Sequence, residues 1–292
     1  MQSKRKTWKR IFVYLAGLLV LLLISLTVYV VIHYNYISLK SGATLRVFKA
    51  SSFNNRRSVI TIFPGGGYSA LGRWNEGYLW VPFFHRLGYT VAVLEYRMPC
   101  HDYSIPLSDA TEAMIALKKR TKDFDYDIDK IGLMGFSAGG HLASTMMVTE
   151  NDTIRPDFVL LFYPVVSMRK ELTHMGSHNN FLDDHASKQL EHQFSNELHV
   201  SKNNPPVFIA VSKNDSVVNP LNSIILSKEI SQVGRPVSLH IYPEGGHGWG
   251  YMRSFPYRRQ MISDMMNWLD SLSYFHSCNS FSKHEWEFVF KK

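Results

Sequence analysis

Cysteine is scarce in this chain of 292 residues, which contains only Cys100 and Cys278. Two cysteines are too few for a disulfide-rich scaffold or for a zinc module built from cysteine ligands. The sequence leaves open whether the two pair with each other. Acidic residues are also in the minority, with 24 Asp and Glu against 32 Lys and Arg. Hydrophobic residues make up 45% of the chain, which excludes a wholly disordered or collagen-like protein.

The excess of positive charge is concentrated at the N-terminus. Residues 1–40 contain six basic residues and no acid, whereas the other 252 residues contain 26 basic and 24 acidic ones. A protein that binds nucleic acid through a basic face needs that charge on its folded body. The charge distribution therefore predicts no nucleic-acid partner.

An uncharged, strongly apolar run of 22 residues occupies positions 11–32 and follows the basic segment 1–10. As a helix it would extend about 33 Å, enough to cross a hydrocarbon core of about 30 Å. Because basic residues stay on the cytoplasmic side, we expect a cytoplasmic segment, a transmembrane signal anchor at 11–32 and a body outside the cytoplasm. A cleaved signal peptide, with its small-residue triplet at 41–43, is the alternative and would give a secreted protein.

Short apolar segments alternate with amphipathic ones from residue 58 onward. Apolar runs without polar alternation predict strands buried on both faces, and the intervening helices then predict a mostly parallel, doubly wound α/β sheet. The expected strands are 58–63, 90–96, 130–135, 157–162, 206–211 and 237–241, and the expected helices are 78–87, 108–121, 138–148, 220–233 and 258–272. We expect one domain over residues 41–290, with a cap-like insertion at 164–204.

A serine in the sequence GFSAG (135–139) follows a predicted strand and begins a predicted helix. In that context the pattern G-x-S-x-G is typical of a nucleophile elbow, a tight turn that exposes a serine hydroxyl. Ser137 is therefore the candidate nucleophile. The N–H of Ala138 would lie at the start of the helix, where it can stabilise negative charge on a substrate oxygen.

A serine nucleophile needs a base, and the base needs an acid that orients it. In this architecture the acid and then the histidine follow the serine along the chain, each in a loop after a strand. Asp215 follows the strand predicted at 206–211, and His247 lies in a glycine-rich loop after the strand at 237–241. We expect these two residues to complete a catalytic triad with Ser137. Alternative acids are Asp183, Asp184 and Glu244.

A glycine-rich turn, PGGGY at 64–68, follows the first predicted strand. Glycines allow backbone N–H groups to approach an oxyanion closely. The same stretch matches the G-x-G-x-x-A pattern of a dinucleotide-binding turn, with Glu95 at the end of the next strand. Phosphate binding needs a helix that begins at the glycines. The sequence instead predicts a helix start near Tyr78, so we expect no cofactor.

Four histidines within 164–204 could indicate a metal site. Their spacing matches no compact metal site and no cysteine lies near them, so we expect no metal. His141 lies four residues after Ser137 on the same predicted helix and is expected to pack rather than to catalyse. The four histidines are His174, His178, His185 and His192.

The motifs together resemble the α/β-hydrolase superfamily, in particular its acetyl esterase/lipase branch with hormone-sensitive-lipase-like loops. They are most similar to Bacteroidetes carbohydrate esterases of the acetylxylan and feruloyl type. The motifs are PGGGY (64–68), EYRMP (95–99), IGLMGFSAGGHLAS (131–144), FYPV (162–165), THMGS (173–177), ND (214–215) and YPEGGHGWG (242–250). The resemblance covers residues 58–270 and implies an α/β-hydrolase fold.

The resemblance also implies roles for individual residues. It assigns the triad to Ser137, Asp215 and His247 and the oxyanion donors to Gly65, Gly66 and Ala138. Pro64 stands where this branch usually has a histidine, and the predicted anchor is not typical of its secreted, xylan-degrading members.

These observations predict a serine esterase that removes acetyl or other small acyl groups from carbohydrate esters through an acyl-enzyme. Two alternatives remain open: a non-catalytic anchored protein that binds a glycan or a partner, and a serine peptidase on the same fold. A glycosylation-like triplet at 214–216 overlaps the candidate acid Asp215, where a glycan would obstruct the site. The sequence therefore favours a bacterial periplasm over a eukaryotic lumen.

Overall fold

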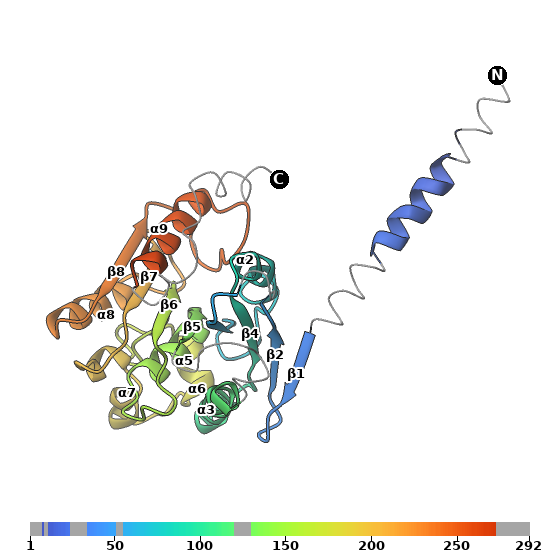
Figure 1. Cartoon of the computed structure of the whole chain (residues 1–292). Coiled ribbons are helices and arrows are strands. Elements are labelled where there is room, and N and C mark those ends of the chain that lie inside the picture. The colour runs from blue at the N-terminus through green and yellow to red at the C-terminus, as the bar shows by residue number, and fades with distance from the viewer. Residues whose placement is uncertain (1–7, 9–10, 24–33, 51–54, 120–129, 273–292) are drawn as a thin grey trace. The chain divides into compact units, whose positions relative to one another are not determined.

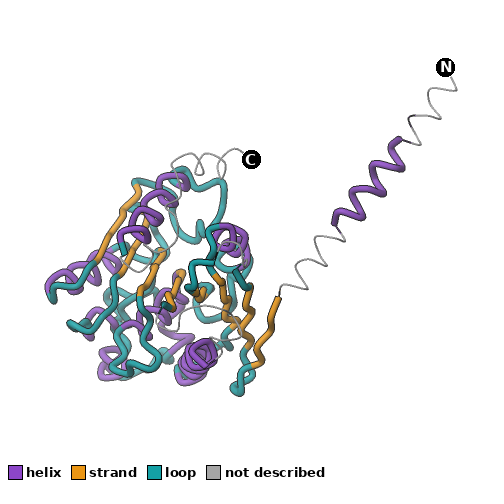
Figure 2. The backbone as a smooth tube through the Cα atoms, viewed as in Figure 1, coloured by secondary structure: helices purple, strands orange, loops and turns teal. Residues whose placement is uncertain are grey.

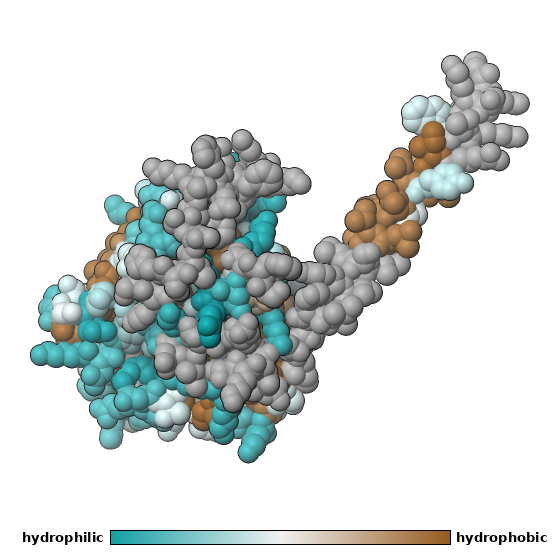
Figure 3. All heavy atoms as spheres, viewed as in Figure 1, coloured by the Kyte–Doolittle hydropathy of each residue, from teal (hydrophilic) through white to brown (hydrophobic). Residues whose placement is uncertain are grey.

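The computed structural model of the chain describes residue 8 and residues 11–23, 34–50, 55–119 and 130–272. The chain divides into two compact units, Met1–Asn35 and Tyr36–Lys292. In the first unit, residues 11–23 are helical and their largely apolar side chains are exposed (Figure 3). Among the described residues, no helix is both long and apolar enough to cross a bilayer. Residues 24–32 of the predicted anchor lie outside the described residues.

Eight strands form one sheet in the order β1-β2-β4-β3-β5-β6-β7-β8 (Figure 1). Strand β2 pairs antiparallel with β4, and every pairing from β4 through β3 to β8 is parallel. The predicted mostly parallel sheet is therefore confirmed. The strands are β1 (Tyr34–Ser38), β2 (Thr44–Phe48), β3 (Val59–Phe63), β4 (Thr90–Glu95), β5 (Ile131–Phe136), β6 (Phe158–Phe162), β7 (Val207–Ser212) and β8 (Val237–Tyr242).

Helices cover both faces of the sheet, as the predicted doubly wound arrangement requires (Figure 2). Helices α3 (Ser104–Lys119), α5 (Ser137–Met147) and α8 (Leu221–Gln232) share one apolar core, and α2 (Val81–Arg86) and α9 (Arg258–Ser271) share the other. Each fully buried Leu, Ile or Phe side chain stabilises such a core by about 1.5–3 kcal/mol. The two cores fix the sheet between the helix layers.

Two helices differ from the sequence prediction at their N-terminal ends. Helix α3 begins at Ser104, earlier than the predicted 108, because Asp102 Oδ1 accepts hydrogen bonds from the backbone N–H and the hydroxyl of Ser104. Pro106 fits in the first turn, where no intrahelical N–H bond is lost. The predicted helix 78–87 is a short 3₁₀ segment, η1 (Tyr78–Trp80), followed by α2.

The predicted insertion at 164–204 contains only short helices. They are α6 (Met175–Phe181), α7 (Lys188–Gln193) and the 3₁₀ segment η2 (Asn196–His199). Cys100 is exposed, whereas Cys278 lies outside the described residues.

Candidate active site

Ser137 is the first residue of α5 and follows the last residue of β5 without any intervening loop. Its φ is +50°, a left-handed conformation that costs a non-glycine residue energy and is found at functional sites. A Cβ on Gly139 would lie 2.2 Å from the Phe63 carbonyl oxygen, so this neighbour must be glycine for the helix to approach β3. Small residues and a strained backbone thus form the predicted strand-to-helix elbow.

Asp215 lies in the turn after β7 and its side chain is completely buried. One carboxylate oxygen, Oδ1, accepts hydrogen bonds from the backbone N–H groups of Val217 at 2.9 Å and Val218 at 3.0 Å. These two bonds fix the plane of the carboxylate. The other oxygen, Oδ2, is directed at His247.

His247 lies in the loop after β8 and bridges the acid and the serine. Its Nδ1 is 2.7 Å from Asp215 Oδ2, and its Nε2 is 2.8 Å from Ser137 Oγ. A carboxylate can only accept, so Nδ1 carries the proton and Nε2 accepts from the serine hydroxyl. The three residues predicted from separate loops therefore form one hydrogen-bonded chain, which is the arrangement that a serine hydrolase requires.

None of the three alternative acids has a hydrogen bond or ion pair with His247 within the described part of the chain. Asp183 accepts from the backbone N–H of His185 at 2.7 Å, Asp184 lies 3.5 Å from the ring of the same histidine, and Glu244 is exposed. The geometry therefore favours Asp215 as the acid.

The glycine-rich loop requires one correction to the predicted oxyanion donors. The N–H of Gly65 already donates a hydrogen bond to Glu76 Oε2 at 2.9 Å, so it is not free to bind a substrate oxygen. The N–H groups of Gly66, Gly67 and Ala138 donate to no acceptor among the described residues. Of the three predicted donors, Gly65 is therefore excluded by its bond to Glu76, whereas Gly66 and Ala138 stay predictions.

Glu76 and Tyr163 are site residues that the sequence analysis did not identify. Both are buried; Tyr163 donates a hydrogen bond to Glu76 Oε1 at 2.7 Å and its ring lies edge-on to His247, with 4.7 Å between ring centroids. Burial raises the pKa of Glu76, and the hydrogen bonds from Tyr163 and Gly65 partly offset that rise. The available signal was that Glu76 is the only acid between residues 64 and 89.

Asn75 connects the loop that follows the glycines to the loop that carries His247. Its Nδ2 donates to the Gly248 carbonyl at 2.9 Å, and its Oδ1 accepts from the Tyr251 N–H at 3.0 Å. No local sequence pattern indicates this contact, because the two segments are more than 170 residues apart.

His174, from the insertion, lies beside the same loop. Its Nδ1 accepts from the Ser177 backbone N–H at 3.2 Å, which places its ring proton on Nε2. Its Cε1 lies 3.9 Å from the position that a Cβ on Gly67 would occupy. Burial lowers its pKa, and the charge of His247 lowers it further. His174 is thus a neutral hydrogen-bond donor next to the glycine-rich loop.

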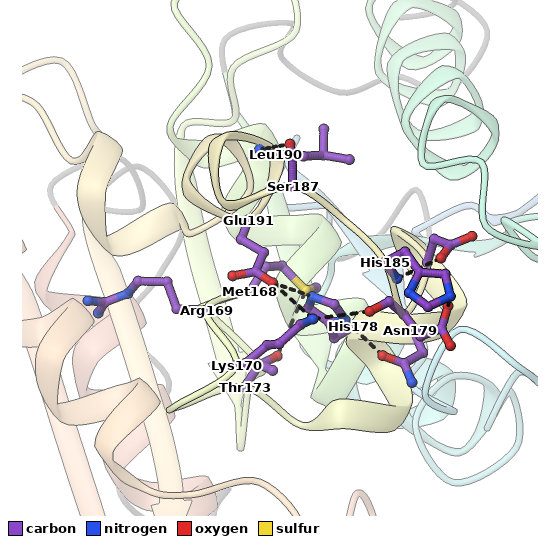
Figure 4. Close-up of polar contacts among 12 residues, drawn as sticks. Met168, Arg169, Lys170, Thr173, His178, Asn179, His185, Ser187, Leu190 and Glu191 are labelled. Atoms are coloured by element: carbon purple, nitrogen blue, oxygen red, sulfur yellow. Dashed lines mark hydrogen bonds and ion pairs between the residues drawn. The ribbon is translucent and has the colours of Figure 1, made fainter.

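The insertion histidines have separate environments. His178 is buried with Nε2 3.2 Å from Glu191 Oε1, and Lys170 Nζ lies 3.8 Å from the same carboxylate oxygen (Figure 4). The His185 side chain is 92% exposed and points away from that cluster. Over the described residues, no three His, Cys, Asp or Glu side chains are arranged to hold a metal ion.

His141 has the packing role that the sequence predicts. It is completely buried on α5, with Nε2 donating to the Phe194 carbonyl at 2.8 Å and Nδ1 accepting from the Tyr68 hydroxyl at 2.9 Å. It therefore ties the glycine-rich loop to the end of the insertion.

The dinucleotide-binding alternative does not fit the structure. The three glycines are followed by a turn, and the next helical residues are those of η1 at Tyr78–Trp80. Glu95 accepts a hydrogen bond from the Tyr78 hydroxyl and forms ion pairs with Arg46 and Arg73. Neither the helix terminus nor the ribose-binding acid of such a unit is present.

Comparison with known proteins agrees with this geometry. The BD-FAE family model matches residues 45–230, which is more than half of the chain. An acetylxylan esterase of Xylanibacter ruminicola is 35% identical over 74% of this chain and 46% of its own length. Endo-1,4-beta-xylanase B of Butyrivibrio fibrisolvens is 30% identical over 66% of this chain and 32% of its own length. The chain thus spans less than half of either curated relative.

A solved structure covers most of both chains. The acetyl ester-xyloside bifunctional hydrolase from Caldicellulosiruptor lactoaceticus is 29% identical, with a TM-score of 0.75 over 80% of this chain and 89% of its own. The fold is therefore the α/β-hydrolase fold that the motifs imply. From the family model, the sequence relatives and the fold, we conclude that this chain belongs to the BD-FAE family of α/β-hydrolases.

Proposed function

We propose that this chain is a serine esterase that removes acetyl or other small acyl groups from carbohydrate esters. The observation that carries the proposal is the position of His247, 2.8 Å from Ser137 Oγ and 2.7 Å from Asp215 Oδ2 at the carboxyl edge of a parallel sheet. Such a contact gives a serine hydroxyl the base that it needs at neutral pH.

The first half of the reaction forms an acyl-enzyme. Ser137 Oγ attacks the ester carbonyl carbon while its proton passes to Nε2 of His247. The carbonyl oxygen becomes an oxyanion that the N–H groups of Gly66, Gly67 and Ala138 can bind. The bond to the alcohol oxygen then breaks, and Nε2 returns the proton to the leaving alcohol.

The second half releases the acyl group. Nε2 of His247 takes a proton from water, and the resulting hydroxide attacks the acyl carbon. The bond to Ser137 Oγ breaks, Oγ recovers the proton from Nε2, and the carboxylic acid leaves. Asp215 remains ionised throughout and stabilises the imidazolium that forms in each half.

The proposed substrate class comes from the relatives. Two of the proteins to which this chain is similar are named for the hydrolysis of acetylated xylan or of an acetyl ester and a xyloside. The test is a panel of acetylated xylo-oligosaccharides, feruloylated sugars and short p-nitrophenyl esters. We expect the highest kcat/KM on acetylated oligosaccharides; hydrolysis of none of the carbohydrate esters would contradict this substrate class.

Replacement of the nucleophile tests the catalytic assignment. We expect Ser137→Ala to lower kcat on p-nitrophenyl acetate by at least about 10⁴-fold, because only binding and oxyanion stabilisation remain. Ser231→Ala, on the exposed face of α8, is the matched control and should retain wild-type activity. An active Ser137→Ala variant would refute the triad.

A fluorophosphonate probe separates the esterase from the two alternatives. A non-catalytic binding protein would leave Ser137 unlabelled in the folded wild-type chain. A serine peptidase would be labelled but would cleave peptides in preference to esters. We expect labelling at Ser137, together with a preference for esters.

We also propose that residues 11–32 anchor the chain in a membrane and that the catalytic unit lies outside the cytoplasm, in a bacterial periplasm. Support comes from the uncharged run of 22 residues and the basic residues before it. Carbonate extraction of the full chain should leave it in the membrane fraction. A mature protein that starts near Thr44 would instead indicate signal cleavage.

Thiol labelling tests on which side of the membrane the catalytic unit lies. Cys100 is exposed, so in a Cys278→Ser variant a membrane-impermeant maleimide reports the location of the catalytic unit. We expect labelling in intact spheroplasts and none in a variant that lacks both thiols. Labelling only after lysis would place the unit in the cytoplasm.

A further inference from the structure

A second buried carboxylate lies next to the catalytic triad. Glu76 is 7% exposed and takes no part in the Ser137, Asp215 and His247 chain. Its Oε2 accepts the Gly65 N–H at 2.9 Å, and its Oε1 accepts the Tyr163 hydroxyl at 2.7 Å. A Cβ on Gly65 would lie 2.6 Å from Glu76 Oε2 and 2.9 Å from the Cβ of Ser137. The carboxylate therefore reaches a loop that is packed directly against the nucleophile.

Tyr163 continues the connection to the loop of the catalytic base. Its hydroxyl oxygen accepts the Gly250 N–H at 2.8 Å, three residues after His247, and its ring lies against the imidazole. Its φ is +37°, a strained value for a tyrosine that persists only where the surroundings enforce it. Two hydrogen bonds thus link Glu76 to the loop that carries His247 (the histidine loop, 243–250). One hydrogen bond links it to the glycine-rich loop at 64–68 (the oxyanion loop).

The hydrogen bonds to Glu76 match those of an ionised carboxylate. The Gly65 N–H can only donate, so Oε2 accepts. The Tyr163 hydroxyl already accepts from Gly250, and Glu76 Oε1 is the acceptor in reach of its own proton. Both carboxylate oxygens therefore accept, which is the pattern of a charged group.

We propose that Glu76 is a positioning residue for the esterase reaction, which holds the oxyanion loop and the histidine loop in register and whose charge stabilises the imidazolium of His247. This inference rests on the proposed function. It gives the active site a second acid that acts on the base from a distance, whereas Asp215 acts by direct contact.

The charge interaction between Glu76 and His247 also acts on the pKa of Glu76. The charge of His247 lowers the pKa of Glu76 against the rise that burial causes, so by reciprocity an ionised Glu76 favours the charged imidazole. The groups in contact with His247 are Asp215 and Ser137 by hydrogen bond and Tyr163 by its ring, and the charge of His247 also lowers the pKa of Glu76 and of His174.

The test is Glu76→Gln in the full chain. The amide removes the charge and can accept only one of the two hydrogen bonds. We expect kcat on p-nitrophenyl acetate to fall about 10- to 100-fold with KM within about threefold, because the lost interactions act on the reacting geometry. The acid limb of the kcat/KM profile should move to lower pH, because the imidazolium loses a favourable charge.

Glu95→Gln is the matched control. Glu95 is also a largely buried carboxylate that accepts a tyrosine hydroxyl, but its ion pairs are with Arg46 and Arg73. It should keep the wild-type kcat and the wild-type acid limb. If Glu76→Gln changes only the melting temperature, as Glu95→Gln can, the inference is wrong.

Tyr163→Phe separates the positioning of the loops from the effect of the Glu76 charge. It remains a test even if Glu76→Gln fails to fold. It breaks the link to Gly250 but leaves the carboxylate, so kcat should fall while the acid limb moves far less than in Glu76→Gln. A wild-type kcat in Tyr163→Phe would refute the positioning role. The double variant should lose no more than Glu76→Gln alone, because the two residues act as one unit.

The rate at which a fluorophosphonate labels Ser137 provides a readout that is independent of the acyl substrate. It should fall in Glu76→Gln and stay unchanged in Glu95→Gln. A wild-type chain that is neither active nor labelled would contradict the proposed esterase function itself. An active wild type with an equally active Glu76→Gln variant would contradict only the role of Glu76.

Discussion

At the scale of single residues, the two oxygens of Asp215 have different tasks. Oδ1 is held by two backbone N–H groups, and Oδ2 accepts a hydrogen bond from the Nδ1–H of His247. Asp215→Asn preserves the shape but presents an N–H₂ group to Nδ1, which favours the wrong imidazole tautomer. We expect kcat to fall about 10³- to 10⁴-fold, measured with short p-nitrophenyl esters at saturating concentration.

Asp183→Asn is the control for that experiment, because its carboxylate bonds to a backbone N–H within the insertion. It should keep wild-type activity. If Asp215→Asn keeps most of its rate while Asp183→Asn loses it, the acid has been assigned wrongly.

The residues of the triad could be predicted because each carries a local signal. Ser137 lies in a five-residue pattern, and His247 lies among glycines after an apolar run. Glu76 carries no such pattern, since its role depends on Tyr163, 87 residues away. The hydrogen bond from the Gly65 N–H to Glu76 could not be predicted either, because Glu76 reaches the glycine-rich loop only in the folded chain.

At the scale of elements, α5 carries a buried titratable group as well as the nucleophile. Burial lowers the pKa of His141 to about 4, against about 6.5 in an unfolded chain. Between these values the unfolded chain binds a proton that the folded chain does not, so the free energy of unfolding falls as the pH falls. We expect a loss of about 2 kcal/mol between pH 7 and pH 5 from this residue, measured by urea denaturation.

His141→Asn should reduce that pH dependence even though it destabilises the protein at neutral pH. His185→Gln, which removes an exposed histidine, should leave it unchanged. An unaltered slope in His141→Asn would show that other groups govern the acid sensitivity.

The strands of the parallel sheet could be predicted because they are continuous apolar runs. Strand β2 alternates buried and half-buried residues, and β1 has the sequence YNYIS, so neither is a continuous apolar run. The start of α3 was predicted too late, because the prediction followed the apolar spacing after residue 108, whereas the helix begins where Asp102 bonds to Ser104.

At the scale of the whole molecule, the insertion is bonded to the oxyanion loop. Asn180 Nδ2 donates to the Gly67 carbonyl at 2.9 Å. We expect Asn180→Ala to lower kcat by a similar factor on every ester tested, because the loop that it positions serves all substrates alike. The panel of acetylated oligosaccharides, feruloylated sugars and p-nitrophenyl esters provides the measurement.

Asn203→Ala, at an exposed position near the end of the insertion, should leave all rates unchanged. A variant of Asn180 that reverses the order of substrates would show that the residue contacts the substrate instead of positioning the loop.

The insertion could be predicted as an interruption of the strand and helix rhythm, but its contacts could not. They depend on side chains such as Phe181, which stacks on Tyr68 with ring centroids 4.7 Å apart. No periodic pattern specifies such a contact between segments more than 100 residues apart.

The hydrogen bonds that join the insertion to the glycine-rich loop limit how the proposed activity could be extended to new substrates. An insertion whose backbone follows a different path would lose the hydrogen bond from Asn180 to Gly67 and the bond between the Phe194 carbonyl and His141, and we expect a lower rate on every ester. Single exchanges at exposed insertion positions such as Met175 leave those bonds in place and are the conservative way to vary this segment. Engineers who recombine members of this family should exchange the loop and the insertion together.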